Sequence, residues 1–173
     1  MKITKQISKT LITIVVLMSF LCACGTSSSE ITEAVKGYQK DLMRPDTLLV
    51  RDVYLLKGQV YDDETINSST MDFDEDEKAE YSKKCNYVYV RCSFENAGGT
   101  VVEGSFVYDL DGKQYYIIDA DELDRLVSVP GYNPSRIEAF AMNMYYGWDF
   151  YFEDGTLEQL SDSDIDSINK QLK

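Results

Sequence analysis

The amino-acid sequence predicts an α+β fold, a single domain in which an antiparallel β-meander has helices packed on one face. The first observation is the clean alternation of apolar and polar side chains over residues 86–95, which is typical of a strand with two different faces. The second is a pair of turn signals, at residues 96–99 and 111–112, that links this strand to the two that follow. The third is the helical spacing of apolar residues at both ends of the chain.

The N-terminal part of the domain predicts a helix, a strand and an acidic segment. Ser29 suits a helix N-cap, apolar residues then recur on one helical face as far as Leu42, and Pro45 ends the helix. Residues 47–56 are rich in branched apolar side chains and predict a strand. Residues 58–84 are crowded with Asp and Glu, so we expect a long acidic loop with a helical turn at residues 75–82. We further expect residues 61–80 to be dispensable for folding.

Three strands and three helices are predicted after the acidic segment. The strands are residues 86–95, 101–109 and 113–118, and a short helix follows at residues 121–127. Asn133 and Pro134 suit the start of the next helix, which Gly147 ends. Residues 148–152 could add a last strand before a turn at residues 154–155, and Ser161 or Ser163 caps a terminal helix that runs to Leu172.

The N-terminus predicts an export signal. Three lysines precede an apolar run of eleven residues, 11–21, which is too short for a membrane-spanning helix of ~20 residues. Leu21, Ala23 and Cys24 resemble the lipobox of bacterial lipoproteins, with a branched residue at −3, a small residue at −1 and then the modified cysteine. The resemblance implies that residues 1–23 are removed and that Cys24 carries a diacylglyceryl anchor. The predicted organisation is therefore a signal peptide (1–23), a lipidated cysteine with a Gly/Ser tether (24–29) and a globular domain (30–173).

The net charge limits the classes of partner that the domain is expected to bind. The formal charge is −13, and it becomes −16 without residues 1–23, because that segment holds three lysines and no acidic residue. Such a surface argues against nucleic acid as a partner, because the phosphates of nucleic acid require Lys and Arg.

Cys85 and Cys92 stand at opposite ends of a predicted strand and are too far apart for a disulfide, so we interpret Cys92 as a core residue and Cys85 as a free thiol.

Two segments resemble small secreted or lipid-anchored domains of Gram-positive bacteria that have no known activity. These are residues 42–54, with the order Pro-Asp-Thr and then Arg-Asp-Val-Tyr, and residues 87–99, which begin Tyr-Val-Tyr-Val-Arg and end in Gly-Gly. Together with the lipobox, the resemblance implies a protein of the cell envelope on the extracytoplasmic face of the membrane.

Catalytic and metal-binding motifs are weak in this chain. The absence of histidine removes Ser-His-Asp and Cys-His chemistry, and no cofactor or metal is predicted. Residues 72–76 open like an EF-hand loop, but Glu77 replaces the required Gly and Lys83 the bidentate Glu, so a solvated acidic loop is the preferred interpretation. Paired carboxylates could serve a glycosidase-like hydrolase, although the sequence does not indicate which two would face each other.

The candidate binding surface is the outward face of the meander, formed by Tyr87, Tyr89, Arg91 and Tyr115. Tyrosine and arginine are enriched at interface hot spots, and the alternative is that the strand tyrosines lie in the core under a helix or loop. The expected function is a membrane-anchored, non-catalytic binding module for an envelope protein, peptide or glycan. The alternatives are a small carboxylate-dependent hydrolase of the envelope and an immunity-type lipoprotein that shields the cell.

Overall fold

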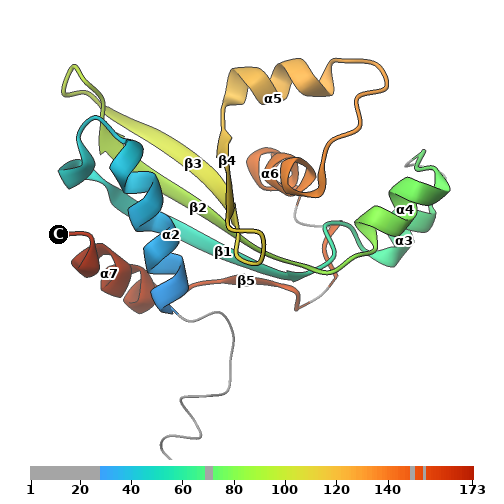
Figure 1. The fold of residues 1–173 in the computed structure, drawn as a ribbon, viewed down its shortest axis with the longest axis horizontal. Coiled ribbons are helices and arrows are strands. Elements are labelled where there is room, and N and C mark those ends of the chain that lie inside the picture. Colours follow the sequence, from blue (N-terminus) through green and yellow to red (C-terminus); the bar gives the residue numbers. More distant parts are fainter. Residues whose placement is uncertain (1–27, 69–71, 149–150, 154) are drawn as a thin grey trace, which may run out of the picture.

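The computed structural model describes residues 28–68, 72–148, 151–153 and 155–173, which build one antiparallel sheet and the helices around it. The strand order is β4-β3-β2-β1-β5, so the first four strands are neighbours in chain order and form a meander (Figure 1). The α+β class, the single domain and the antiparallel meander are thereby confirmed. The strands are β1 (Leu49–Gly58), β2 (Cys85–Glu95), β3 (Val101–Asp109), β4 (Gln114–Ile118) and β5 (Leu157–Gln159).

One face of the sheet is covered by α2 (Ser28–Asp41) and α7 (Asp162–Gln171), which lie side by side (Figure 1). The apolar stripe of α2 that the sequence indicates packs onto this face, where the ring of Tyr38 stacks on Phe106 with centroids 4.5 Å apart. The residues that β2 contributes to this core are its even-numbered set, as the alternation predicts. They are Val88, Val90 and Cys92.

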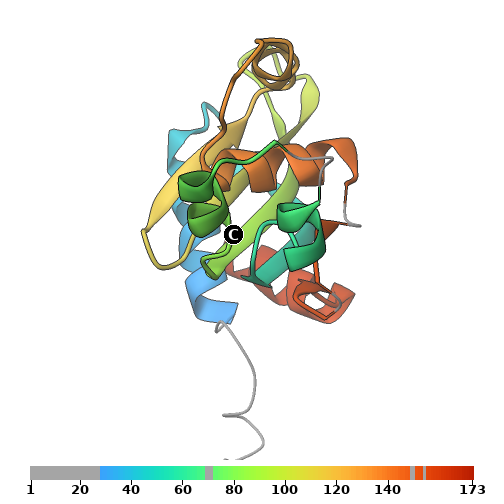
Figure 2. The same cartoon turned by 90° about the vertical axis from the view of Figure 1, so that its right-hand side faces the viewer.

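The opposite face is covered by α6 (Arg136–Tyr146), whereas the sequence predicts helices on one face only. Figure 2 shows α6 lying across the sheet. Its fully buried Phe140 packs against Tyr87 of β2, with ring centroids 5.7 Å apart. Helices therefore enclose the sheet from both sides, because both faces of the central strand β2 carry large apolar or aromatic side chains that must be buried.

The helix α5 (Ala120–Val127) follows β4 directly and stands apart from the sheet (Figure 1). Asp119 caps its first turn through the N–H groups of Asp121 and Glu122. Leu123 is fully buried, and the hydroxyl of Tyr146 donates to the Asp124 carboxylate at 2.7 Å. These contacts join α5 to the C-terminal end of α6.

The acidic segment at 58–84 is not the long loop that the sequence predicts. Its described residues contain α3 (Asp63–Asn67) and α4 (Glu75–Tyr81), which lie beyond the ends of β1 and β2 (Figure 1). The second helix coincides with the predicted helical turn. Ile66 is 2% and Tyr61 6% exposed, so the segment contributes to the core, and this burial argues against its predicted dispensability for folding.

Other boundaries differ by a few residues. A 3-10 turn, η1 (Pro45–Thr47), precedes β1, and the N-cap of α6 is Ser135 instead of Asn133, because Ser135 and Glu138 form a capping box. The last strand is β5 and not residues 148–152; of the latter, 149–150 lie outside the described residues and 151–152 are not in a strand. Ser161 caps α7 as predicted.

Candidate binding groove

The predicted lipidation site, Cys24, lies with residues 1–23 outside the described residues. Among the helices that the structure describes, none has the length and the apolar character needed to cross a membrane. The lipid anchor therefore stays a prediction of the sequence.

Two members of the candidate surface, Tyr87 and Tyr89, lie in the core under α6. They are 4% and 5% exposed, so the expectation of an outward-facing tyrosine pair is wrong. Burial raises the pKa of Tyr87 to about 12. Burial also raises the pKa of Tyr89, against the opposing effects of a hydrogen bond with Ser105 and the charge of Arg91. Both hydroxyls therefore stay protonated at physiological pH.

The other two members lie on opposite faces of the sheet. Arg91 follows Tyr89 on the α6 face, but α6 does not cover it, and its side chain is 51% exposed. Tyr115 pairs with Tyr108, which pairs with Val88, so it belongs to the α2 face. Its hydroxyl donates to the backbone carbonyl of Ala34 in α2. Of the four predicted residues, the structure brings together Tyr89, which α6 covers, and Arg91, which lies beside it on the open part of the α6 face.

A β-bulge in β1 adds two charged residues to this open part. The register with β2 shifts between Val50 and Asp52, which makes Arg51 the extra residue. Arg51 Nε donates to Ser93 Oγ at 3.1 Å, and Asp52 Oδ2 lies 3.4 Å from Arg91 Nη1. Both partners belong to the α6 face, so the bulge presents two consecutive side chains on one side of the sheet. The signal in the sequence is the polar pair Arg-Asp, which interrupts an otherwise branched apolar strand.

Arg51, Tyr89 and Arg91 line a groove of about 680 Å³ between the sheet, the end of α6 and the start of α5. The floor is formed by β2 and β3, where Tyr89 and Arg91 stand opposite Val107 and Ser105. One wall comes from Arg51 and the other from the end of β4 and Asp119. Further lining side chains include Glu103 of β3, Ile117 and Ile118 of β4, and Met144 and Tyr145 of α6.

The charges in the groove are arranged in two parts. On the β1–β2 side, Arg91 is paired with Asp52, whereas the Arg51 guanidinium has, among the described residues, only the hydrogen bond from Nε to Ser93. Its two Nη groups are therefore open to a ligand. On the β3–β4 side stand the carboxylates of Glu103 and Asp119, of which Asp119 is engaged as the cap of α5. A guanidinium can hold a carboxylate or phosphate through two parallel hydrogen bonds.

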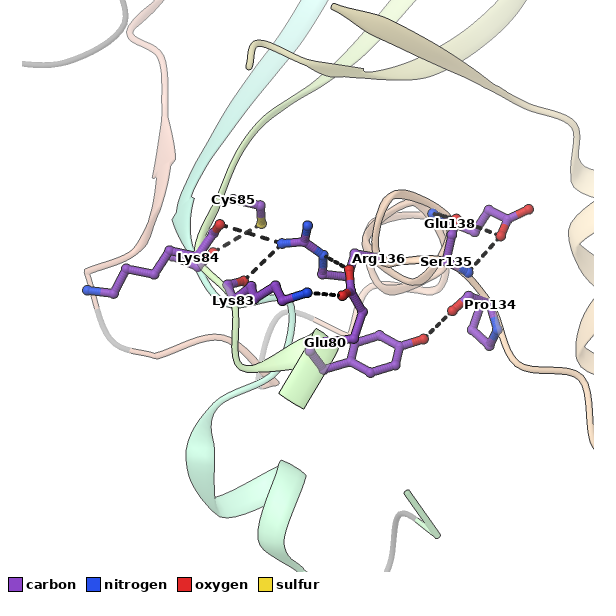
Figure 3. A network of polar contacts seen from close by, with 10 residues as sticks. Glu80, Lys83, Lys84, Cys85, Pro134, Ser135, Arg136 and Glu138 are labelled. Atoms are coloured by element: carbon purple, nitrogen blue, oxygen red, sulfur yellow. Dashed lines mark hydrogen bonds and ion pairs between the residues drawn. The ribbon is translucent and has the colours of Figure 1, made fainter. Parts of the chain in front are cut away.

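A second hollow, of about 490 Å³, lies between α4 and the N-terminal end of α6, and Arg136 occupies its inner side. Figure 3 shows how its guanidinium joins the two segments: Nε donates to Glu80 at 2.8 Å, and Nη1 to the Lys83 carbonyl at 3.1 Å. Hydrogen bonding from Lys83, together with Arg136, lowers the pKa of the Glu80 carboxyl. Since Arg136 already bonds both the carboxylate and the chain behind it, we interpret this hollow as a structural clamp.

The acidic run at residues 72–76 is used for helix capping. The Asp74 carboxylate accepts from the N–H of Glu77 at 2.9 Å, and the Glu77 carboxylate accepts from the N–H of Asp74 at 2.8 Å. Among the residues that the structure describes, no three His, Cys, Asp or Glu side chains gather as a metal site would require.

Both cysteines of the domain are free and buried, in agreement with the predicted absence of a disulfide between them. Cys92 belongs to the core under α2, and the Cys85 thiol donates to the Gly58 carbonyl at 3.0 Å. Burial raises the pKa of each thiol to about 12. Neither is therefore a thiolate nucleophile at neutral pH.

Comparison with protein-family models, with curated proteins and with solved structures finds no match to this chain. The chemistry of the groove is consequently argued from its residues alone.

Proposed function

We propose that the chain is a lipid-anchored protein of the extracytoplasmic membrane face, and that its domain is a non-catalytic binding module for an anionic ligand of the cell envelope. The observation that carries the binding site is the placement of Arg51 and Arg91 on one face of neighbouring strands, at the wall and floor of a groove of about 680 Å³. The support for the anchor is the lipobox pattern that ends at Cys24.

The groove suits an acidic group because of what surrounds the two arginines. The chain as a whole carries a formal charge of −13, so a long-range field repels anions, and only a local concentration of donors can hold one. Arg51 offers its Nη groups, and Arg91 is balanced by a single carboxylate, that of Asp52. The Ser105 hydroxyl, which hydrogen-bonds with Tyr89, lies beside them in the groove. Tyr145, 40% exposed, offers an aromatic ring at the rim for the apolar part of a ligand.

Substitution of Arg51 tests the binding site. The mature chain, beginning at Cys24 and purified in detergent micelles, is titrated by calorimetry with three anionic probes: hexapeptides with a free carboxyl terminus, a uronic-acid oligosaccharide and inorganic phosphate. We expect at least one probe to bind, and Arg51→Gln to weaken that binding about tenfold, the effect of losing about 1.4 kcal/mol of charge-assisted hydrogen bonding.

The matched control is Arg125→Gln, because Arg125 is an exposed arginine of α5 that lies outside the groove lining and 3.9 Å from Glu122. This variant should bind as the unchanged chain does. Binding that falls equally in both variants would indicate a general charge effect and contradict the proposed site. Product release from the oligosaccharide or the peptide would contradict the non-catalytic class.

A further inference from the structure

The edge of the sheet at β3 is only partly paired. In the register between β3 and β4, the last pair is Ser105 with Ile118, after which the chain turns away at Asp119 into α5. The pairing of β3 with β2 continues four residues further, as far as Val101 opposite Glu95. Four residues of β3, 101–104, therefore extend beyond β4 and form a sheet edge about 13 Å long.

The hydrogen-bond pattern of the β2–β3 hairpin determines which backbone groups face this edge. The N–H of Asn96 donates to the carbonyl of Thr100, and antiparallel pairs alternate between bonded and non-bonded. The backbone groups of the even-numbered residues of β3 therefore form hydrogen bonds with β2. The same pattern continues just past the end of β3, where the N–H of Leu110 donates to the carbonyl of Asn86. The N–H and C=O groups of Val101 and Glu103 consequently point away from β2. Within the described part of the chain, no backbone or side-chain group pairs with the N–H of either residue.

The free edge of β1, on the other side of the sheet, is covered by a side chain. Beyond β5, the free side of β1 is covered by Asn169 of α7, whose Oδ1 accepts from the Val50 N–H at 2.8 Å. The Asn169 Nδ2 donates to the carbonyl of Val50 at 3.0 Å. One side chain thus replaces a strand at that edge. The fold closes the edge at β1 and leaves open the edge at β3.

The open edge forms one side of the groove. Glu103 and Gly104 lie on one side, Asp119 and Ala120 on the other, and the two sides meet where Ser105 pairs with Ile118. Arg91 pairs with Ser105 from the β2 side of β3, and its side chain reaches this closed end over the α6 face. An extended peptide could bond to Val101 and Glu103, but it could not continue past the closed end, so a chain terminus fits better than a chain interior.

We propose that the groove takes up the carboxyl-terminal end of an extended peptide as a short additional strand on β3, with its last residue turned over the α6 face of Ser105 so that its carboxylate meets Arg91 and Arg51. The inference rests on the proposed function and specifies its ligand. The peptide runs parallel to β3, because only then does its carboxyl end reach the closed end of the groove. The side chain opposite Glu103 is expected to be basic, since oppositely charged cross-strand neighbours stabilise a sheet.

A peptide library tests the carboxylate. Random hexapeptides with a free carboxyl terminus, and the same hexapeptides with an amidated terminus, are selected on the mature chain in detergent micelles. The free-acid peptides should be enriched and the amidated ones should not. Equal enrichment of both forms, or no enrichment of either, would overturn the inference.

Substitution of Glu103 tests the strand edge. Glu103→Pro removes the N–H that faces the open edge and leaves the bonds between β3 and β2 in place, whereas Glu103→Ala removes the same side chain and keeps the N–H. Fluorescence polarisation of the most enriched peptide should give an affinity about tenfold lower for the proline variant than for the alanine variant. Equal affinities would show that the edge is not used.

Hydrogen exchange of the unsubstituted chain gives an independent measurement if the proline variant does not fold. The peptide should slow exchange at the amides of Val101 and Glu103, and exchange that is unchanged at both would overturn the inference. If peptides fail but the oligosaccharide or phosphate binds with dependence on Arg51, the proposed function stands and the peptide inference falls.

Discussion

Neighbouring residues on one strand face have different surroundings in this protein. Tyr89 and Arg91 point to the same side of β2, but α6 covers the first and ends before it covers the second. Alternation in a sequence indicates the side of a sheet and not the extent of the helix above it. The same limit applies to Tyr115: its register across two turns determines its face, and the structure places it on the α2 face, 40% exposed and with its hydroxyl bonded to Ala34.

Substitution of these two residues should separate core from surface. We expect Tyr89→Ala to lower the free energy of unfolding by about 3–5 kcal/mol, the usual cost of removing a buried aromatic ring. Arg91→Ala should cost at most about 1 kcal/mol, because its ion pair with Asp52 is partly exposed to solvent. Urea denaturation of both variants measures the difference. Similar losses for the two would show that Tyr89 is not part of the core.

Arg51 marks the limit of sequence-based prediction at the groove. The Arg-Asp pair in β1 breaks the alternation, which indicates a bulge, but the partner strand and its register decide which side the extra residue takes. The prediction from sequence therefore included Arg91 and missed Arg51, although the two line the same groove.

Elements were predicted well where their signal is local. The meander rests on turn signals and alternation, and α7 on a cap and a repeated apolar spacing, and all of these are confirmed. The acidic segment is predicted as a loop because its many Asp and Glu residues obscure the signal of its few apolar residues. Its acidic side chains cap α3 and α4 at Asp62 and Asp74, while Ile66 and Tyr81 turn inward. Charge density at helix starts is compatible with order, since the first turn of a helix favours negative charge.

The packing of α3 is expected to contribute to stability. Ile66→Ala should lower the free energy of unfolding by about 2–4 kcal/mol, because the side chain is 2% exposed in the core under α6. Glu64→Ala on the exposed side of the same short helix serves as the control and should change stability by no more than about 0.5 kcal/mol. Thermal unfolding of the two variants gives the comparison. A negligible effect at Ile66 would restore the interpretation of this segment as a dispensable loop.

For the whole molecule, helices on both faces could not be deduced from the pattern of one strand. The tyrosines of β2 look like an outer face because they carry hydroxyl groups, yet their rings are large enough to require a cover, which α6 supplies. The predicted localisation, by contrast, rests on the N-terminal sequence that ends at Cys24.

Removal of the Cys24 thiol tests that localisation. We expect Cys24→Ala to block lipidation and to move the protein from the membrane fraction to precursor or soluble forms, since two acyl chains are needed for stable anchoring. Fractionation followed by mass spectrometry of the N-terminal peptide measures both effects. Cys22→Ala is the matched control and should leave the membrane fraction unchanged. An unmodified Cys24 in the mature chain would contradict the anchor.

The direction of α2 determines how an anchored domain would be oriented. A chain held at Cys24 has about 14 Å at most before Ser28 begins α2, so the start of this helix stays next to the bilayer. The 14 residues of α2 then span about 21 Å. At the far end, Arg44 pairs with Glu95 beside the hairpin from which the open edge of β3 extends. The groove would therefore open away from the lipid headgroups, toward molecules that approach from the wall side of the cell.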